Sequence, residues 1–287
     1  MKVVGSIEEL VVWCDRYRAA GLSVGFVPTM GALHQGHVSH LLAAKAECDR
    51  VVVSIFVNPT QFGPGEDLEK YPKTPESDLE ACRRAGVDLA FFGTASDMYP
   101  RHFQTWVSAD ELSRPLCGRS RPGHFRGVAT VVAQLLNLVK PHRAYFGLKD
   151  YQQLLVIRRL AMDLHFDTEI RACQTVREGD GLAMSSRNAY LDARARQVAP
   201  RIYRALLAAR ALAIGGEQRV AQIRKRLLEE LQPGPELEVD YAEVLNAEDL
   251  SEFEGGVASG SPSGILIAVA ARVGRARLID NLVIPPS

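Results

Sequence analysis

Three of the seven histidines of this 287-residue chain lie within seven positions, as His34, His37 and His40 in the stretch VPTMGALHQGHVSH. Histidines at this spacing can bind a metal ion, line the solvated face of a helix, or donate hydrogen bonds to an anion. A helix that began at Gly36 or His37 would place His34 and His37 one turn apart, facing the same ligand. The unpaired main-chain N–H groups of its first turn and the helix dipole would then favour a phosphate group.

A zinc site at these histidines lacks the usual companions. The stretch contains no H-E-x-x-H pattern and no cysteine, and a spacing of three residues turns His40 away from His34. The familiar phosphate-binding patterns, G-x-x-x-x-G-K-[ST] and G-x-G-x-x-G after a strand, are also missing from the chain. The pattern H-x-G-H after an apolar run therefore favours an anion site, with ordinary solvated histidines as the alternative.

The composition is that of a globular protein, with 47% hydrophobic and 24% charged residues. Thirty-four basic and thirty-four acidic residues give a net charge of zero, whereas nucleic-acid binding usually requires a basic excess, so we expect no nucleic-acid partner. No stretch approaches the ~18 consecutive apolar residues of a membrane helix, and the N-terminus lacks the apolar core of a signal peptide. The five cysteines form no CxxC pair, which is typical of a cytoplasmic protein.

Short apolar runs alternate with helical periodicity over the first part of the chain. The runs predict strands at residues 22–28, 51–57, 87–92 and 143–146. The periodic segments predict helices at residues 38–48, 77–85, 128–138 and 152–163. Strands that alternate with helices of this length are typical of a doubly wound parallel sheet, so we expect an α/β domain over residues 1–177.

The pattern changes after Arg177. Helices are expected at residues 193–214 and 218–231, followed by strands at 236–245, 264–272 and 276–284. Helices grouped ahead of strands predict a smaller α+β domain over residues 178–287.

Polar motifs follow three of the expected parallel strands. They are TMGALHQGH after the first, NPTQF at residues 58–62 after the second, and GLKD at residues 147–150 after the fourth. In an open α/β sheet, ligands bind beyond the carboxyl ends of the strands. The three motifs together therefore predict one pocket, which no single motif would do.

Two signatures far apart in the chain resemble those of the nucleotidylyltransferase and class I synthetase superfamily: H-x-G-H at residues 34–37 and MSSR at residues 184–187. Such proteins hold ATP with histidines at a helix N-terminus and with a second, mobile loop. Seven blocks, in order from Val27 to Asn281, resemble the pantoate–β-alanine ligase family more narrowly. They are VPTMGALHQGH, VVVSIFVNPTQF, EDLEKYPKT, RPGHFRGVAT, YFGLKDYQQL, DGLAMSSRNAYL and ARLIDN.

This resemblance implies a Rossmann-like N-terminal domain, a smaller C-terminal lid domain and a homodimer. It implies a reaction in which pantoate, β-alanine and ATP give pantothenate, AMP and pyrophosphate, with Mg²⁺ as cofactor. The carboxylate of pantoate would attack the α-phosphorus of ATP, and the amine of β-alanine would then attack the acyl-adenylate.

The resemblance also implies roles for individual residues. The ATP-binding turn would consist of Met30, Gly31, Ala32, Leu33, His34, Gln35, Gly36 and His37. Further ATP contacts would come from Gly147, Leu148, Lys149, Asp150, Val176, Met184, Ser185, Ser186 and Arg187. Gln61 and Gln153 would bind pantoate, while His34, His37 and Lys149 would stabilise the phosphoryl charge; no metal ligand is identified. Leu148 stands where many members carry Glu, which leaves this position a main-chain role only.

Several of these residues also have a purely structural interpretation. Asp150, Ser185 and Ser186 can cap the helices that follow them, and Lys149 and Gln61 can be solvated. A basic surface loop is expected to contain Arg119, Arg121, His124 and Arg126, with contact to the pocket as the alternative. Tyr71 and Asp78 could reach the site or the metal, and we assign neither a role.

Three other functions compete with the ligase. A different nucleotidylyltransferase would need a basic site for a phosphorylated acceptor, whereas the substrate loops here carry glutamines. An aminoacyl-tRNA synthetase fragment is disfavoured by the neutral charge. A non-catalytic nucleotide sensor would be expected to lose His37 or Lys149, and both are present.

Overall fold

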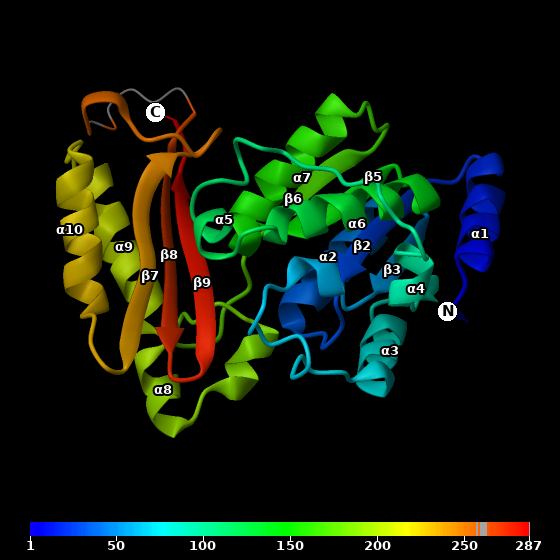
Figure 1. Cartoon of the computed structure of the whole chain (residues 1–287), viewed down its shortest axis with the longest axis horizontal. Helices are drawn as coiled ribbons and strands as arrows, with labels where there is room; N and C mark the ends of the chain where they lie inside the picture. Colours follow the sequence, from blue (N-terminus) through cyan, green and yellow to red (C-terminus); the bar gives the residue numbers. More distant parts are fainter. Residues whose placement is uncertain (257, 259–262, 287) are drawn as a thin grey trace. The chain divides into compact units, whose positions relative to one another are not determined.

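The computed structural model describes residues 1–256, 258 and 263–286 (Figure 1). These residues form two compact units. The first unit comprises Met1–Ser113, Arg121–Leu148 and Gln153–Gln174, and the second comprises Arg114–Ser120, Lys149–Gln152 and Thr175–Ser287. Two short segments from the N-terminal part of the chain thus pack with the second unit. The domain boundary expected after residue 177 stays a prediction.

The first unit is built on a six-stranded sheet with the strand order β1-β4-β3-β2-β5-β6. Each pairing between these strands is parallel, which confirms the expected doubly wound sheet. The strands are β1 (Lys2–Val4), β2 (Val24–Thr29), β3 (Arg50–Ile55), β4 (Leu89–Phe91), β5 (Arg143–Gly147) and β6 (Glu169–Cys173). β1 and β6 were not expected from the sequence. Both are edge strands with several exposed positions, so they lack the continuous apolar run that marks a buried strand.

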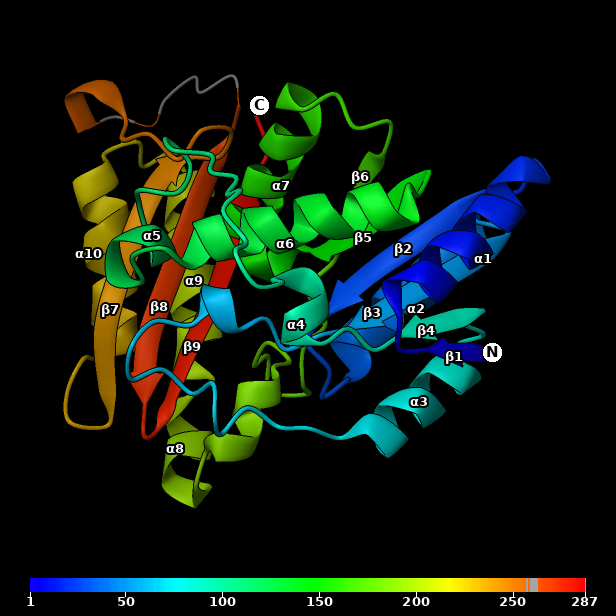
Figure 2. The same ribbon diagram turned by 45° about the vertical axis from the view of Figure 1, so that its right-hand side comes forward.

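Helices cover both faces of this sheet (Figure 2). The longer helices are α1 (Ile7–Ala19), α2 (Gln35–Glu47), α3 (Pro75–Arg84), α6 (His124–Val139) and α7 (Tyr151–Asp163), with the short α4 (Ala95–Met98) between α3 and α6. Leu41 and Ala44 of α2 and Cys82 of α3 share one core cluster with Val51 and Val53 of β3. Strand residues alternate between the two faces, so α1 and α6, which pack on each other, cover the opposite side.

The order of the strands places a topological switch beside β2. From β2 the chain winds outward to β3 and β4, and then returns to form β5 and β6 on the other side of β2. Such a reversal leaves a crevice at the carboxyl ends of the two strands that flank it. These ends are Thr29 of β2 and Gly147 of β5, and each is followed directly by a predicted nucleotide motif.

The second unit is an α+β structure, as expected. Its antiparallel sheet has the order β7-β8-β9, formed by Leu237–Asn246, Ile265–Val273 and Ala276–Ile284. The helices α9 (Arg201–Ile214) and α10 (Val220–Leu231) bury one face of this sheet (Figure 1). The single helix expected over residues 193–214 is wrong: α8 (Ala193–Val198) ends before α9 begins. The cause is Pro200, which has no N–H to continue the helix.

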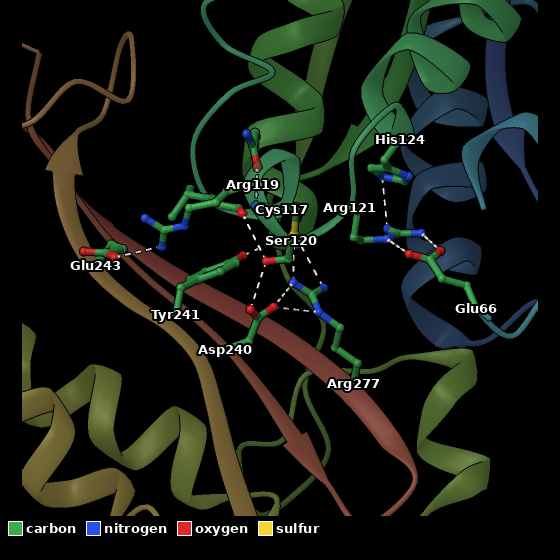
Figure 3. Close-up of polar contacts among 12 residues, drawn as sticks. Glu66, Cys117, Arg119, Ser120, Arg121, His124, Asp240, Tyr241, Glu243 and Arg277 are labelled. Carbon is green, nitrogen blue, oxygen red and sulfur yellow. Dashed lines mark hydrogen bonds and ion pairs between the residues drawn. The ribbon is translucent and has the colours of Figure 1, made fainter. Parts of the chain in front are cut away.

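The opposite face of this sheet meets the short helix α5 (Cys117–Ser120) through polar contacts (Figure 3). The thiol of Cys117 lies 3.3 Å from the hydroxyl of Tyr241, and burial raises the pKa of this tyrosine well above its ordinary value. The guanidinium of Arg277 donates to Asp240 at 2.6 and 2.9 Å, and Ser120 donates to the same carboxylate at 2.9 Å. The contacts of Cys117 and Ser120 thus fasten α5 to this sheet.

No helix in the described ranges has both the length and the apolar character needed to cross a membrane. The five cysteines are all buried and unpaired.

Candidate functional site

The turn that follows β2 is held by one buried carboxylate. Gly31 and Ala32 both adopt a positive φ, of 83° and 51°, which is unfavourable for a residue with a side chain. Asp78 of α3 is 2% exposed and accepts the main-chain N–H groups of Ala32 at 3.0 Å and Leu33 at 2.8 Å. Asp78 therefore fixes the backbone directly ahead of His34. The only sequence signal for this role was an acidic residue in the first turn of the helix after Thr74-Pro75.

His34 is the N-cap residue of α2, which begins at Gln35, one residue before Gly36 and three residues before the start at residue 38 that the periodicity predicted. Its Nδ1 accepts the N–H of Gly36 at 3.1 Å, and Nδ1 of His37 accepts the N–H of His34 at 3.3 Å. A neutral imidazole that accepts through Nδ1 carries its proton on Nε2, so the donor atom of each ring is Nε2. The ring centroids are 4.1 Å apart, and the first turn of α2 contains no acidic residue. Two imidazole donors at a helix N-terminus whose first turn has no acidic residue form a site suited to an anion.

The same contacts weigh against a zinc site. Because Nδ1 of His34 and of His37 accepts a main-chain N–H, Nε2 carries the proton in both rings, and neither ring nitrogen has a lone pair for a metal ion. The ring of His40 lies 6.4 Å from that of His37. Within the described part of the chain, no group of three or more His, Cys, Asp or Glu residues is arranged to hold a metal ion.

Gln61 lies at the end of the 3₁₀ helix η1 (Pro59–Gln61), which follows β3. Its Nε2 donates to Sδ of Met30 at 2.9 Å, and its Oε1 accepts from the buried Asn58 at 3.2 Å. Its main-chain oxygen is bonded by Arg121 at 3.2 Å and by His124 at 2.8 Å. Gln61, which is expected to bind the acid substrate, thus contacts Met30, the first residue of the expected ATP-binding turn. Both residues belong to the first unit.

Arg121 and His124 are positioned by Glu66 (Figure 3). Both carboxylate oxygens of Glu66 accept from Arg121, at 2.7 and 2.6 Å, and Arg121 donates to Nε2 of His124 at 3.1 Å. That bond leaves the proton of His124 on Nδ1, which then donates to Gln61. Burial raises the pKa of Glu66, but the hydrogen bonds and charge of Arg121 outweigh it, so this pKa lies below its ordinary value.

The expected basic surface loop is therefore wrong in part. Arg121 is only 15% exposed and contacts the Gln61 loop, as does His124. Arg119 remains 61% exposed and pairs with Glu243, while the guanidinium of Arg126 stacks on the ring of Trp106. Residues of this stretch also form α5 and the start of α6 rather than a continuous loop.

Helix α6 approaches η1 closely because residue 127 is a glycine. A Cβ atom there would lie 2.4 Å from the carbonyl oxygen of Thr60 and 2.8 Å from the nitrogen of Gln61. The carbonyl oxygen of Gly127 accepts from the side chain of Asn58 at 3.2 Å. The main chain at Gln61 is thus confined by α6 as well as by Arg121 and His124.

The second unit brings other predicted residues together. The N–H of Met184 donates to the carbonyl of Val176 at 3.0 Å, so the segment between them forms a hairpin. Ser185 follows and accepts the N–H of Arg187 at 3.2 Å as the N-cap of η3 (Ser186–Tyr190). The structural interpretation of Ser185 as a cap is confirmed, and a phosphate-binding role is compatible with it.

The remaining predicted residues lie in both units. Gly147 ends β5 and Leu148 follows it, while Gln153 is half-buried in α7; these three belong to the first unit. Lys149 and Asp150 belong to the second unit and complete the 3₁₀ helix η2 (Leu148–Asp150), after which α7 begins at Tyr151.

Replacing Asp78 by Asn tests the anchoring of the turn after β2. Asparagine has nearly the same size as aspartate. Its side-chain N–H₂ group would, however, face at least one of the two main-chain N–H groups, and two donors cannot form a hydrogen bond. Since a hydrogen bond to a charged group is worth about 1.5–3 kcal/mol, we expect the free energy of unfolding to fall by about that amount in urea titration. Glu76→Gln, an exposed change on the same helix turn, is the control. Equal stabilities of the two variants would contradict the anchoring role.

Replacing Gly127 by Ala tests the close approach of α6 to η1. The added methyl group overlaps the Thr60 carbonyl, and overpacking of this kind costs about 1–3 kcal/mol. Gly63→Ala is the matched control, because its Cβ would meet nothing closer than 3.7 Å. A Gly127→Ala protein that unfolds at the same urea concentration as the Gly63→Ala protein would show that the two segments separate freely.

Known proteins resemble this chain over its whole length. The family model described as pantoate-beta-alanine ligase matches residues 2–283. A pantothenate synthetase of Thermotoga neapolitana is 48% identical over 99% of this chain and 100% of its own, and one of Geobacter sulfurreducens is 46% identical over 99% of each.

Solved structures agree with these matches. The crystal structure of the pantothenate synthetase from Thermus thermophilus has a TM-score of 0.91 at 46% identity, with full coverage of both chains. The ligase from Francisella tularensis, described as complexed with beta-gamma ATP and beta-alanine, has a TM-score of 0.79 at 32% identity, also with full coverage. The chain therefore belongs to the pantoate–β-alanine ligase family.

Proposed function

We propose that this protein is an ATP-dependent ligase that condenses pantoate with β-alanine to pantothenate and releases AMP and pyrophosphate. The observation that carries the proposal is the pair of Nε2–H donors of His34 and His37 at the start of α2, beside a Gln61–Met30 contact. In the proposal, the start of α2 is the anion site and Gln61 belongs to the site for the acid, in a chain that belongs to this ligase family.

In the proposed first step, a carboxylate oxygen of pantoate attacks the α-phosphorus of ATP, and pyrophosphate leaves with the electrons of the broken P–O bond. Negative charge accumulates on the phosphoryl oxygens in the transition state. Donors that are already oriented stabilise this charge without reorganising, and His34 and His37 are oriented by their main-chain bonds. Lys149 would add a positive charge.

The acid itself is proposed to bind to Gln61 and Gln153. A neutral amide can bind hydroxyls and a carboxylate without cancelling the charge that makes the carboxylate nucleophilic. In the structure Gln61 donates to the thioether of Met30, which is a weak acceptor. A substrate oxygen can therefore replace the sulfur at little cost while the main chain at Gln61 stays in place.

In the proposed second step, the amine of β-alanine attacks the carbonyl carbon of the pantoyl-adenylate. The bond from this carbon to the phosphate oxygen breaks, and AMP leaves. An acyl-adenylate hydrolyses in open water, so the reaction needs a shielded site. We propose that the second unit, which carries Met184, Ser185, Ser186 and Arg187, acts as the lid.

Mg²⁺, a homodimer and a cytoplasmic location are also part of the proposal and come from the family resemblance and the unpaired cysteines. Mg²⁺ usually binds through one or two carboxylates, substrate phosphates and water, and it would neutralise triphosphate charge here. In the proposal Asp150, which follows Lys149 in η2, would offer one carboxylate to such an ion.

Isotope exchange tests the proposed intermediate. With pantoate, ATP and Mg²⁺ but no β-alanine, the protein should move labelled pyrophosphate into ATP, because adenylation is reversible while the adenylate stays bound. Omitting pantoate is the control and should abolish exchange. Exchange that appears only after β-alanine is added would contradict a separate adenylation step.

His34→Ala and His37→Ala test the phosphate site. Each removes one transition-state donor, so turnover should fall by about 10²- to 10³-fold in a steady-state assay of AMP release. His40→Ala is the matched control on the same helix and should stay within a few-fold of wild type. Wild-type turnover in both test variants would refute the assignment, and a stoichiometric zinc ion lost from them would favour a metal site instead.

A further inference from the structure

Two consecutive residues of β9, Asp280 and Asn281, hold two separate predicted nucleotide segments of the second unit. The side-chain amide of Asn281 donates to the carbonyl oxygen of Lys149 at 2.8 Å. The carboxylate of Asp280 accepts from both terminal nitrogens of Arg177, at 2.5 and 3.0 Å. Neighbouring strand residues point to opposite faces of a sheet, so each segment is fastened from a different side of β9.

The Asp280 contact extends to the hairpin between Val176 and Met184. Arg177 directly follows Val176 and also donates to the carbonyl of Gly181 at 3.1 Å. Its guanidinium carbon lies 3.7 Å from the centroid of the Tyr203 ring. The hairpin is thus fixed by an ion pair, a hydrogen bond and a stacked ring.

The hairpin tip also requires a glycine. A Cβ atom at Gly181, where φ is 92°, would lie 2.3 Å from the ring of Tyr203.

Burial raises the pKa of Asp280, although Arg177 and the nearby charge of Lys149 act in the opposite direction. Asp280 is 4% exposed, so loss of Arg177 would leave its carboxylate buried without its ion-pair partner.

We propose that Asp280 and Asn281 are positioning residues for the ligase reaction, with Asn281 setting the place of Lys149 and Asp280 that of the Val176–Met184 hairpin. The inference rests on the proposed function. A lysine side chain has four rotatable bonds, so the reach of its ammonium group depends on where its main chain is held. A misplacement of about 1 Å can cost 10²-fold in rate, so a bond to the Lys149 carbonyl affects the reaction without touching a substrate.

Asn281→Ala removes this bond and leaves the charges of the second unit unchanged. We expect kcat of pyrophosphate exchange to fall about 10- to 100-fold, with the KM for pantoate changed less than about threefold. Tyr151→Phe is the matched control, because it removes another bond from a side chain to a main-chain carbonyl in the same unit, that of Ala247 at 2.8 Å. The control should keep kcat within about twofold of wild type.

Asn281→Asp provides a readout that a loss of stability would not give. An ionised carboxylate faces the Lys149 carbonyl with no proton to donate, whereas a protonated one can restore the bond. The ratio of its kcat to that of wild type should therefore rise as the pH is lowered from 8 to 5.5. The same ratio for Asn281→Ala should stay flat.

Each result has a clear consequence. If wild type fails to exchange pyrophosphate, the proposed function falls and the inference falls with it. If wild type exchanges and Asn281→Ala matches Tyr151→Phe, or if kcat per folded molecule is unchanged while the melting temperature drops, only the positioning role is overturned. A flat pH ratio for Asn281→Asp also overturns it.

Discussion

The main-chain N–H groups at the start of α2 have no partners within the helix, and the way in which they are satisfied determines what the first unit can bind. His34 and His37 use their Nδ1 atoms for this purpose, so the protons of both rings are carried on Nε2. A capping interaction therefore also creates two oriented donors. Asp78 supports it by holding the preceding turn, in which Ala32 keeps an unfavourable positive φ.

A common pattern relates the two units: other residues hold the main-chain carbonyl of a residue whose side chain is proposed to bind a substrate. At Gln61 the carbonyl is bound by Arg121 and His124, and the amide rests on a weak thioether acceptor. At Lys149 the carbonyl is bound by Asn281. Catalysis needs reacting groups in place before the reaction starts, and it also needs side chains that can exchange partners when substrates arrive.

Much of this architecture follows from the sequence, because buried parallel strands leave continuous apolar runs. Such runs marked β2, β3, β4 and β5, and the motifs after them marked the switch point. The edge strands β1 and β6 left no such signal, since part of each faces solvent. Pro200 was visible in the sequence, but alanine-rich periodicity on both sides of it hid the break between α8 and α9.

The supporting residues were harder to predict than the residues they support. Asp78, Arg121 and Asn281 act on positions 45, 60 and 132 residues away in the chain. No local pattern shows that a carboxylate, a guanidinium or an amide will end beside a particular carbonyl or N–H group. The motif residues are found by type and spacing, whereas their anchors depend on the fold.

In the proposed reaction, the acid is activated by transfer of one of its oxygens to the α-phosphorus of ATP. Pantoate labelled with ¹⁸O in both carboxylate oxygens can be followed by mass spectrometry of the products after turnover with ATP and β-alanine. We expect one ¹⁸O atom in each AMP and none in pyrophosphate. Label in inorganic phosphate with ADP as the nucleotide product, or unlabelled AMP, would contradict it.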